Sequence, residues 1–204
     1  MRSKWLEWAQ QILSIAHAGL EYSKSPFDLE RYEKLRKLSA EIVATYGNID
    51  VEKAELLFAS DKGYQTPKVD VRAIVHDHGR LLLVKEHDDR WALPGGWAEP
   101  NLSLRENVVK EVLEESGMEV RPRRVVAILD RNRYADDEYP YSVYKIFVQC
   151  DWLGGEFKQN IETKAARFFP ENEIPELSRT RNTIEQIRMC FRHIRSEQET
   201  VEFD

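Results

Sequence analysis

Residues 93–118 read LPGGWAEPNLSLRENVVKEVLEESGM, and this stretch decides how the rest of the chain is interpreted. Ser103 followed three residues later by Glu106 is the capping-box pattern found where helices begin. Gly117 stands where a residue with a left-handed backbone commonly ends a helix. The stretch therefore predicts a glycine-rich turn followed by a helix that runs from about Ser103 to Ser116.

Three glutamates share one face of this predicted helix. Glu111, Glu114 and Glu115 are spaced i, i+3 and i+4, which places them on neighbouring turns. Like charges at this spacing repel, so the cluster costs stability unless something compensates it. Carboxylate oxygens are the ligands that Mg²⁺ and Mn²⁺ prefer. A solvated acidic helix face has the same spacing, so the spacing by itself leaves both interpretations open.

The stretch resembles the box of the Nudix hydrolases. In that family a Gly is followed after five residues by Glu, and after seven more by Arg-Glu, an aliphatic, any residue, Glu-Glu, any residue, Gly and an aliphatic. Gly96 matches the first Gly, and residues 110–118 supply the last nine positions. The lead-in at residues 93–96 is also similar to the family's usual approach to the box. A match this long favours metal binding over a solvated acidic face.

The resemblance implies a site and a cofactor. It implies that Glu111, Glu114 and Glu115 hold divalent cations, with the backbone carbonyl of Gly95 as an added ligand. Mg²⁺ is the expected ion and Mn²⁺ the alternative. Such ions bridge a diphosphate and lower the pKa of a water molecule. The general base is either Glu111 or Glu162, and Glu162 could equally be an exposed loop carboxylate.

Two positions depart from the box. Leu102 stands where the first Glu belongs, and Lys110 replaces the Arg. In the family those two side chains help to orient the ligand carboxylates, and Lys is not equivalent to Arg for bidentate contacts. Lys110 can still reach Glu114 one turn on or Glu106 one turn back, and Glu99 is a candidate to replace the missing carboxylate. We therefore expect activity to survive, with metal affinity and pH optimum changed.

Candidate substrate-binding residues lie outside the box. Arg131 and Arg133 stand together with an aromatic residue in one predicted loop, which suits a phosphate and a base. A solvated basic loop is the alternative interpretation. Arg72, on a predicted hairpin strand, is a weaker candidate. His76 and His78 flank a predicted hairpin tip, which is favoured there over a metal site.

The remaining pattern predicts strands mixed with helices. The predicted strands are residues 69–75, 81–84, 125–129, 141–152 and 166–169, and a last helix is expected at residues 182–194. This order predicts an α/β fold with a mixed sheet. The resemblance implies the Nudix form of it, an α/β/α sandwich, over residues 66–204.

The first part of the chain has helical periodicity instead. Apolar residues recur at helical spacing over residues 5–20, 35–46 and 51–58, with a break at residues 25–26. We expect a small all-helical unit at residues 1–65. Residues 5–9 and 63–72 resemble a Nudix subgroup with an N-terminal helical extension. That resemblance implies a homodimer in which the helices form the interface and support the substrate site.

Composition restricts the partners. The net charge of −6 argues against passive binding to nucleic acid or anionic membranes. No apolar run approaches the ~20 residues of a membrane span, and the start of the chain has no signal-peptide pattern. We expect a cytoplasmic protein in which Cys150 and Cys190 are buried free thiols.

The resemblance also predicts a reaction. The chain is similar to bacterial CDP-choline pyrophosphatases, and sequences of this kind are also labelled ADP-ribose pyrophosphatases. Hydrolysis of a small nucleotide substrate, CDP-choline in first place and ADP-ribose as the alternative, is the expected activity. Two other possibilities are hydrolysis at an RNA end and a non-catalytic Nudix domain that senses a ligand. The intact acidic cluster at residues 111–115 counts against the sensor.

Overall fold

The structure is a computed structural model, and it describes residues 3–47, 50–52, 54, 64–134, 139, 141–196 and 200–204. The chain divides into two compact units. Unit 1 contains Met1–Pro67 with Asp137–Ser142, and unit 2 contains Lys68–Asp136 with Val143–Asp204. None of the helices described is long and apolar enough to cross a membrane.

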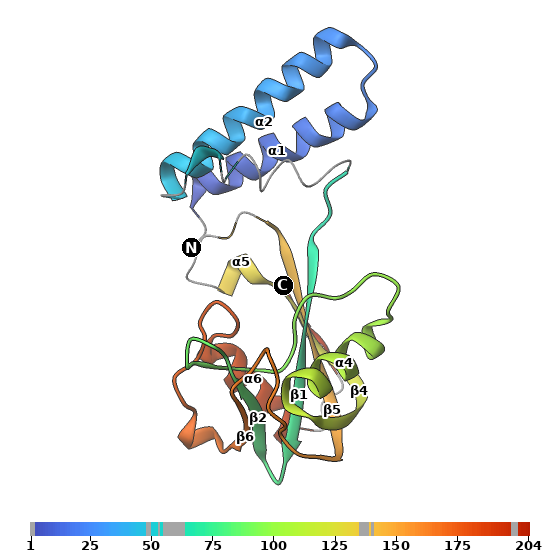
Figure 1. The fold of residues 1–204 in the computed structure, drawn as a ribbon, viewed down its shortest axis with the longest axis vertical. Coiled ribbons are helices and arrows are strands. Elements are labelled where there is room, and N and C mark those ends of the chain that lie inside the picture. Colours follow the sequence, from blue (N-terminus) through green and yellow to red (C-terminus); the bar gives the residue numbers. More distant parts are fainter. Residues whose placement is uncertain are drawn as a thin grey trace. The chain divides into compact units, whose positions relative to one another are not determined.

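Unit 1 is built on two antiparallel helices, α1 (Lys4–Tyr22) and α2 (Pro26–Gly47) (Figure 1). Their contact is lined with small side chains such as Ala9 and Ala40, which let the helices approach closely. The buried Ser39 hydroxyl donates a hydrogen bond of 2.8 Å to the Ala9 carbonyl across this contact. Of the third predicted helix, residues 51, 52 and 54 are helical, and the rest lies outside the described residues.

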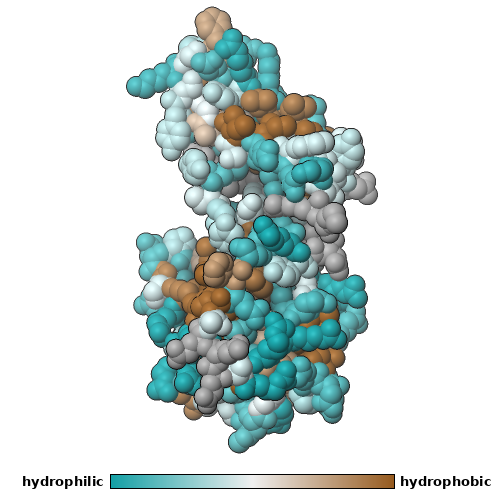
Figure 2. Space-filling view, turned by 180° about the vertical axis from the view of Figure 1, so that it is seen from behind, coloured by the Kyte–Doolittle hydropathy of each residue, from teal (hydrophilic) through white to brown (hydrophobic). Residues whose placement is uncertain are grey.

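The outer surface of unit 1 keeps large apolar side chains exposed. Trp8 and Ile15 are each 58% exposed, and Leu38 is 46% exposed. Figure 2 shows hydrophobic side chains gathered on the surface of this unit. Because a two-helix unit of this size has little core of its own, an exposed apolar patch indicates a contact surface.

Unit 2 contains a mixed sheet. Among the described residues it has seven strands, in the order β3-β2-β1-β5-β4-β7, with β6 paired to β2. The strands are β1 (Lys68–Asp77), β2 (Arg80–Lys85), β3 (Trp91–Ala92), β4 (Met118–Asp130), β5 (Val143–Gly155), β6 (Ala165–Phe169) and β7 (Glu202–Phe203). β1 and β5 run parallel, as do β4 and β7, and the other pairs are antiparallel.

The helices of unit 2 are α4 (Leu104–Ser116), the short α5 (Arg131–Tyr134) and α6 (Ile184–Arg195), with a 3-10 turn η1 (Glu171–Glu173). Residues of β1 alternate between two cores. Val71 and Val75 belong to the core that contains α4, whereas Ile74 belongs to the core that contains α6. The sheet therefore lies between α4 and α6, which confirms the predicted α/β fold.

Several expectations need adjustment or are confirmed. β4 begins at Met118 rather than at residue 125, and β5 runs from Val143 to Gly155. Residues 131–134, expected as a loop, form α5. His78 lies in the turn between β1 and β2, as predicted for a hairpin tip. Cys150 and Cys190 are buried free thiols, as predicted.

Candidate active site

The ends of α4 are fixed by the chemistry read from the sequence. The Ser103 hydroxyl accepts a hydrogen bond from the Glu106 amide, and the Glu106 carboxylate accepts one of 2.7 Å from the Ser103 amide. At the other end Gly117 has a φ of 69° and its N–H donates to the Leu113 carbonyl. Val112, in the middle, is fully buried against the sheet. These contacts set which way the acidic face of the helix points.

Glu115 is the buried member of the acidic cluster. Its side chain is nearly covered, and it accepts a hydrogen bond of 2.8 Å from the Gly95 N–H. Gly95 has a φ of +139°, and an added Cβ would lie 2.0 Å from the Val71 carbonyl oxygen, so only glycine fits this turn. Burial raises the pKa of Glu115 to about 8, against the opposing effects of the Arg72 charge and the Gly95 N–H. A buried carboxylate of this kind is well suited to a cation, which favours its ionised form.

Glu111 lies one turn earlier, against the second glycine. An added Cβ at Gly96 would come within 2.9 Å of a Glu111 carboxylate oxygen, so the glycine leaves room for that side chain. Burial raises the pKa of Glu111; the charges of Lys110 and Arg72 oppose this, whereas those of Glu162 and Glu114 reinforce it. The structure therefore brings Glu111 within electrostatic range of both of those carboxylates.

Glu114 is exposed and bound by a lysine. The Lys110 Nζ lies 2.6 Å from a Glu114 carboxylate oxygen and 3.1 Å from one of Glu99. The expected contact of Lys110 with Glu114 is confirmed, and Glu99, the candidate to replace the missing carboxylate, also contacts Lys110. The alternative partner, Glu106, is occupied by the helix cap. The side-chain hydrogen bonds with Glu114 and Glu99 raise the pKa of Lys110, so its amine stays positively charged.

The three glutamates do not converge in the structure. Within the residues described, no group of three or more His, Cys, Asp or Glu side chains surrounds a point where a metal ion could sit. Glu115 faces the Gly95 amide and Glu114 faces Lys110. Their hard oxygen donors fit a divalent cation in kind, so an ion held by all three requires Glu114 to turn away from Lys110.

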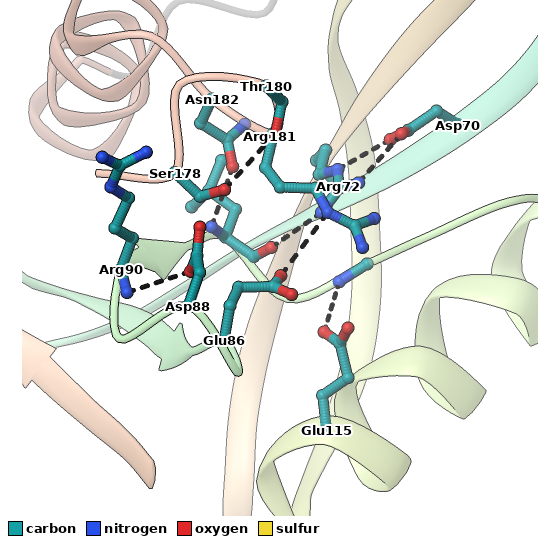
Figure 3. A network of polar contacts seen from close by, with 12 residues as sticks. Asp70, Arg72, Glu86, Asp88, Arg90, Glu115, Ser178, Thr180, Arg181 and Asn182 are labelled. Atoms are coloured by element: carbon teal, nitrogen blue, oxygen red, sulfur yellow. Dashed lines mark hydrogen bonds and ion pairs between the residues drawn. The ribbon is translucent and has the colours of Figure 1, made fainter. Parts of the chain in front are cut away.

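Arg72 is hydrogen-bonded to the start of the glycine turn, at Leu93. It is fully buried, and its guanidinium donates two hydrogen bonds to Asp70, of 2.6 Å and 2.8 Å. A third, of 3.1 Å, goes to the Leu93 carbonyl (Figure 3). Burial alone would lower the pKa of Arg72, but the Asp70 charge and hydrogen bonds raise it. This geometry gives Arg72 a structural role and does not favour the predicted contact with substrate.

The other side of the turn reaches a cavity. The Leu93 N–H donates a hydrogen bond of 2.9 Å to the Asn182 side chain (Figure 3). Asn182 lines a cavity of about 780 Å³, within the usual range of ligand pockets. Other residues that line it are Arg90, Tyr134, Glu176, Arg179 and Glu185. Leu93 and Pro94 therefore separate Asn182, in the wall of this cavity, from the Gly95 amide that binds Glu115.

The predicted substrate residues of α5 differ in accessibility. Arg131 is buried, with 6% of its surface exposed, whereas Arg133 is exposed. Tyr134 belongs to the wall of the cavity. The short helix thus separates the two arginines that the sequence placed together in one loop.

The loop before β6 is tied to α4. Glu162 is exposed on this loop, as expected for a loop glutamate before a strand. The Thr163 hydroxyl donates a hydrogen bond to the Glu115 carbonyl, and the Asn160 side chain donates one of 3.4 Å to the same oxygen. Sequence reasoning missed both residues, although the spacing of Asn160 and Thr163 is typical of a local side-chain turn.

Comparisons with known proteins find relatives that cover most or all of this chain. A Bacillus subtilis (strain 168) protein named provisionally as an ADP-ribose pyrophosphatase is 47% identical over 205 residues, covering 100% of this chain and 99% of that protein. A crystal structure of an ADP-ribose pyrophosphatase from Streptococcus suis is 45% identical with a TM-score of 0.64, covering 68% of this chain and 100% of that one. A crystal structure of a UDP-X diphosphatase is 32% identical with a TM-score of 0.64, covering 99% of this chain and 100% of that one.

Family profiles match both units. Residues 3–58 match the profile described as "UDP-X-like, N-terminal oligomerisation domain". Residues 65–189, more than half of the chain, match the "NUDIX domain". Since a full-length relative at 47% identity agrees with these profiles, the chain belongs to the Nudix hydrolases, as a pyrophosphatase that carries an N-terminal UDP-X-like oligomerisation domain.

Proposed function

We propose that this protein hydrolyses the diphosphate of ADP-ribose or of a UDP-linked compound. The observation that carries the proposal is the glycine turn, which joins two sites. On one side the Gly95 N–H binds Glu115 of the acidic helix, and on the other the Leu93 N–H binds Asn182 in the cavity wall. A nucleotide in the cavity would therefore have its diphosphate beside the carboxylates.

CDP-choline has less support than the sequence suggested. The relatives are named for ADP-ribose or UDP-X. A quaternary ammonium group is typically recognised by an aromatic cage, and among the described residues that line the cavity Tyr134 is the one aromatic side chain. The lining is instead rich in charged and amide side chains, which suit the hydroxyl groups of a ribose or sugar. The names of the relatives also support catalysis over the sensor alternative, and support a small nucleotide over an RNA end.

We infer that Glu111, Glu114 and Glu115, with the Gly95 carbonyl, hold the divalent ions of this reaction. Mg²⁺, or Mn²⁺ in its place, supplies positive charge to the diphosphate when bound. The protein's own part is to bury Glu115 at a fixed distance from the turn and to keep Glu114 beside an exchangeable partner, Lys110.

Glu162 is the proposed general base. Glu111 is already assigned to a cation, and a carboxylate that binds a metal is a poor proton acceptor. The loop of Glu162 is anchored to the Glu115 carbonyl through Thr163, so the base is held near the acidic cluster. Glu162→Gln should lower kcat and leave KM unchanged. Unchanged kcat would return the role to Glu111.

A substrate panel tests the assignment. Purified protein with Mg²⁺ or Mn²⁺ is given ADP-ribose, UDP-glucose and CDP-choline, and the released nucleoside monophosphate is measured. We expect ADP-ribose or UDP-glucose to have the highest kcat/KM. Glu114→Gln should lower that value roughly a thousandfold, whereas Glu119→Gln, an exposed glutamate on β4, should leave it unchanged. A preference for CDP-choline would reject the substrate assignment, and near-normal turnover by Glu114→Gln would reject the metal ligands.

We further propose that unit 1 forms a homodimer interface that supports the substrate site. The match of residues 3–58 to an oligomerisation domain and the exposure of Trp8 and Ile15 support this. Light scattering after size-exclusion chromatography should give twice the chain mass, and Trp8→Ser with Ile15→Ser should shift it toward the monomer. A monomeric wild-type protein at micromolar concentration would contradict the proposal.

A further inference from the structure

A second cavity in unit 2, of about 590 Å³, is lined by basic side chains. His76 comes from the end of β1, Arg123 and Arg124 from β4, Gln149 from β5, and His193 from the last turn of α6. We propose that this cavity binds an oxyanion of the phosphate type, at a site separate from the active site.

The charge of Arg124 is the first argument. Its Nε donates a hydrogen bond of 2.9 Å to the Gln149 side-chain oxygen, and its Nη2 lies 3.4 Å from Nδ1 of His193. Its third nitrogen, Nη1, is buried and has no partner among the residues described. Neither of these partners is a carboxylate, and no ion pair of the half-buried Arg124 guanidinium is found among the described residues. An uncompensated charge is costly away from water, and a bound anion would remove that cost.

His193 lies between Arg124 and the carboxylate of Glu202. Nδ1 of His193 faces Arg124, and its other ring nitrogen, Nε2, lies 2.8 Å from a Glu202 carboxylate oxygen. Glu202 is thus held by the histidine and by Arg192, whose guanidinium lies 3.1 Å from it. Glu202 is therefore engaged by two other side chains, and no ion pair joins it to Arg124 among the described residues.

The rim of the cavity adds a second cation. Arg123 lies 3.5 Å from Asp151, but that carboxylate is shared with Arg121 at 3.0 Å. Two guanidinium groups against one carboxylate leave a positive balance at the mouth of the cavity. His76, half-buried at the end of β1, can donate a hydrogen bond as a neutral imidazole.

The site is distinct from the catalytic turn. The turn is hydrogen-bonded to Val71 and Ala73 of β1, and α4 packs on the face that contains them. Side chains alternate along a strand, so His76 faces the other side, with Ile74 and α6. The basic cavity and the acidic cluster therefore lie on opposite faces of the sheet.

Phosphate binding to the whole, metal-free protein tests the proposal. The probes are inorganic phosphate and ribose 5-phosphate, added at constant ionic strength, with the imidazole resonances of His76 and His193 followed by NMR. We expect saturable shifts of these two resonances and none of His17 in unit 1. If ribose 5-phosphate binds more tightly than inorganic phosphate, the source is a phosphate monoester, and the reverse order identifies free phosphate.

Two variants separate the site from general charge effects. Arg124→Gln should weaken phosphate binding at least about tenfold, and Arg124→Lys should retain part of it. Arg167→Gln, which removes an exposed arginine of β6 outside the cavity, should bind as the wild type does. Absence of saturable shifts up to about 10 mM phosphate, or equal binding by all variants, would overturn the proposal. Because no metal or turnover is involved, either result is independent of the proposed hydrolase activity.

Discussion

Replacing Asp70 by Asn tests the buried ion pair beneath the glycine turn. Arg72 is fully buried and Asp70 is 6% exposed, so the substitution leaves a guanidinium without its carboxylate in the protein interior. Breaking a buried pair in this way typically costs about 3–5 kcal/mol. Arg72 keeps its hydrogen bond to Leu93 and the attraction of the Glu115 and Glu86 charges. We therefore expect the lower part of the range, about 3 kcal/mol.

The assay is urea unfolding followed by tryptophan fluorescence, since Trp91 and Trp97 lie in unit 2. A loss of about 3 kcal/mol should lower the urea midpoint by about 1–3 M, because the urea dependence of small proteins is about 1–3 kcal/mol per molar. Asp77→Asn is the matched control, because it removes the same group from the same strand. Asp77 pairs with Arg80, whose side chain is 48% exposed, and a pair of this kind contributes about 0–1 kcal/mol.

Comparing Asp70→Asn with Asp77→Asn tests whether the buried ion pair holds the glycine turn. If Asp70→Asn lowers the free energy of unfolding no more than Asp77→Asn does, the Arg72–Asp70 pair is not what holds the turn, and the structural role of Arg72 fails. Turnover provides a second measure. Because Arg72 binds the Leu93 carbonyl, Asp70→Asn should also lower kcat at a temperature where the variant is folded.

Three further predictions concern the helix, its lysine and a buried amine. Ser103→Ala removes the cap of α4 and should cost about 1 kcal/mol, measured as a lower urea midpoint. Glu99→Gln should weaken Mg²⁺ activation on the order of tenfold without changing the fold, because Lys110 loses one of its two carboxylates; unchanged activation would show that Glu99 has no such role. Burial, helped by the Arg72 charge, lowers the pKa of Lys145 to about 7. The unfolded chain keeps this proton up to about pH 10, so the free energy of unfolding should rise between pH 7 and 10, by at most about 1.4 kcal/mol per pH unit, and Lys145→Met should flatten the rise.

The parts of the site that rest on local chemistry could be predicted from the sequence. Ser103, Glu106 and Gly117 act within a few residues of one another, so the limits of α4 follow from them. The contact of Lys110 with Glu114 spans one helical turn and is equally local. The family box adds the glycine turn, and the N–H of Gly95 does lie against the acidic helix.

Long-range contacts could not be predicted in the same way. Asn182 reaches Leu93 across 89 residues, and Thr163 reaches Glu115 across 48. Arg72, a weaker candidate for substrate contact on the predicted hairpin strand, is instead fully buried, although arginine is mostly exposed in proteins. Which face of a strand is buried depends on what packs against it.

Strand limits failed for a related reason. β4 starts at Met118, but its exposed residues Glu119, Arg121 and Arg123 interrupt the apolar pattern on which the prediction relied. A strand with one solvated face has this alternation. The two-residue β7 has too little sequence to give a signal, and its Glu202 is bound by Arg192 and His193 of α6 while the strand pairs with β4.

The two positions that depart from the Nudix box, Leu102 and Lys110, can be understood because the site has a buried part and an exposed part. Glu115 and Gly95 are buried and joined by a hydrogen bond, and the buried Arg72 binds the same turn at the Leu93 carbonyl, so a change in any of them disturbs the sheet itself. Glu114 and its partner Lys110 lie at the surface, where ion pairs contribute little to stability. Substitutions in the exposed part therefore leave the fold intact and act on the ion pairs of Lys110 with Glu114 and Glu99 and on the charge beside Glu111. Leu102 is exposed and Lys110 is partly exposed, so both departures from the family box lie where the buried Glu115 and its turn are not disturbed.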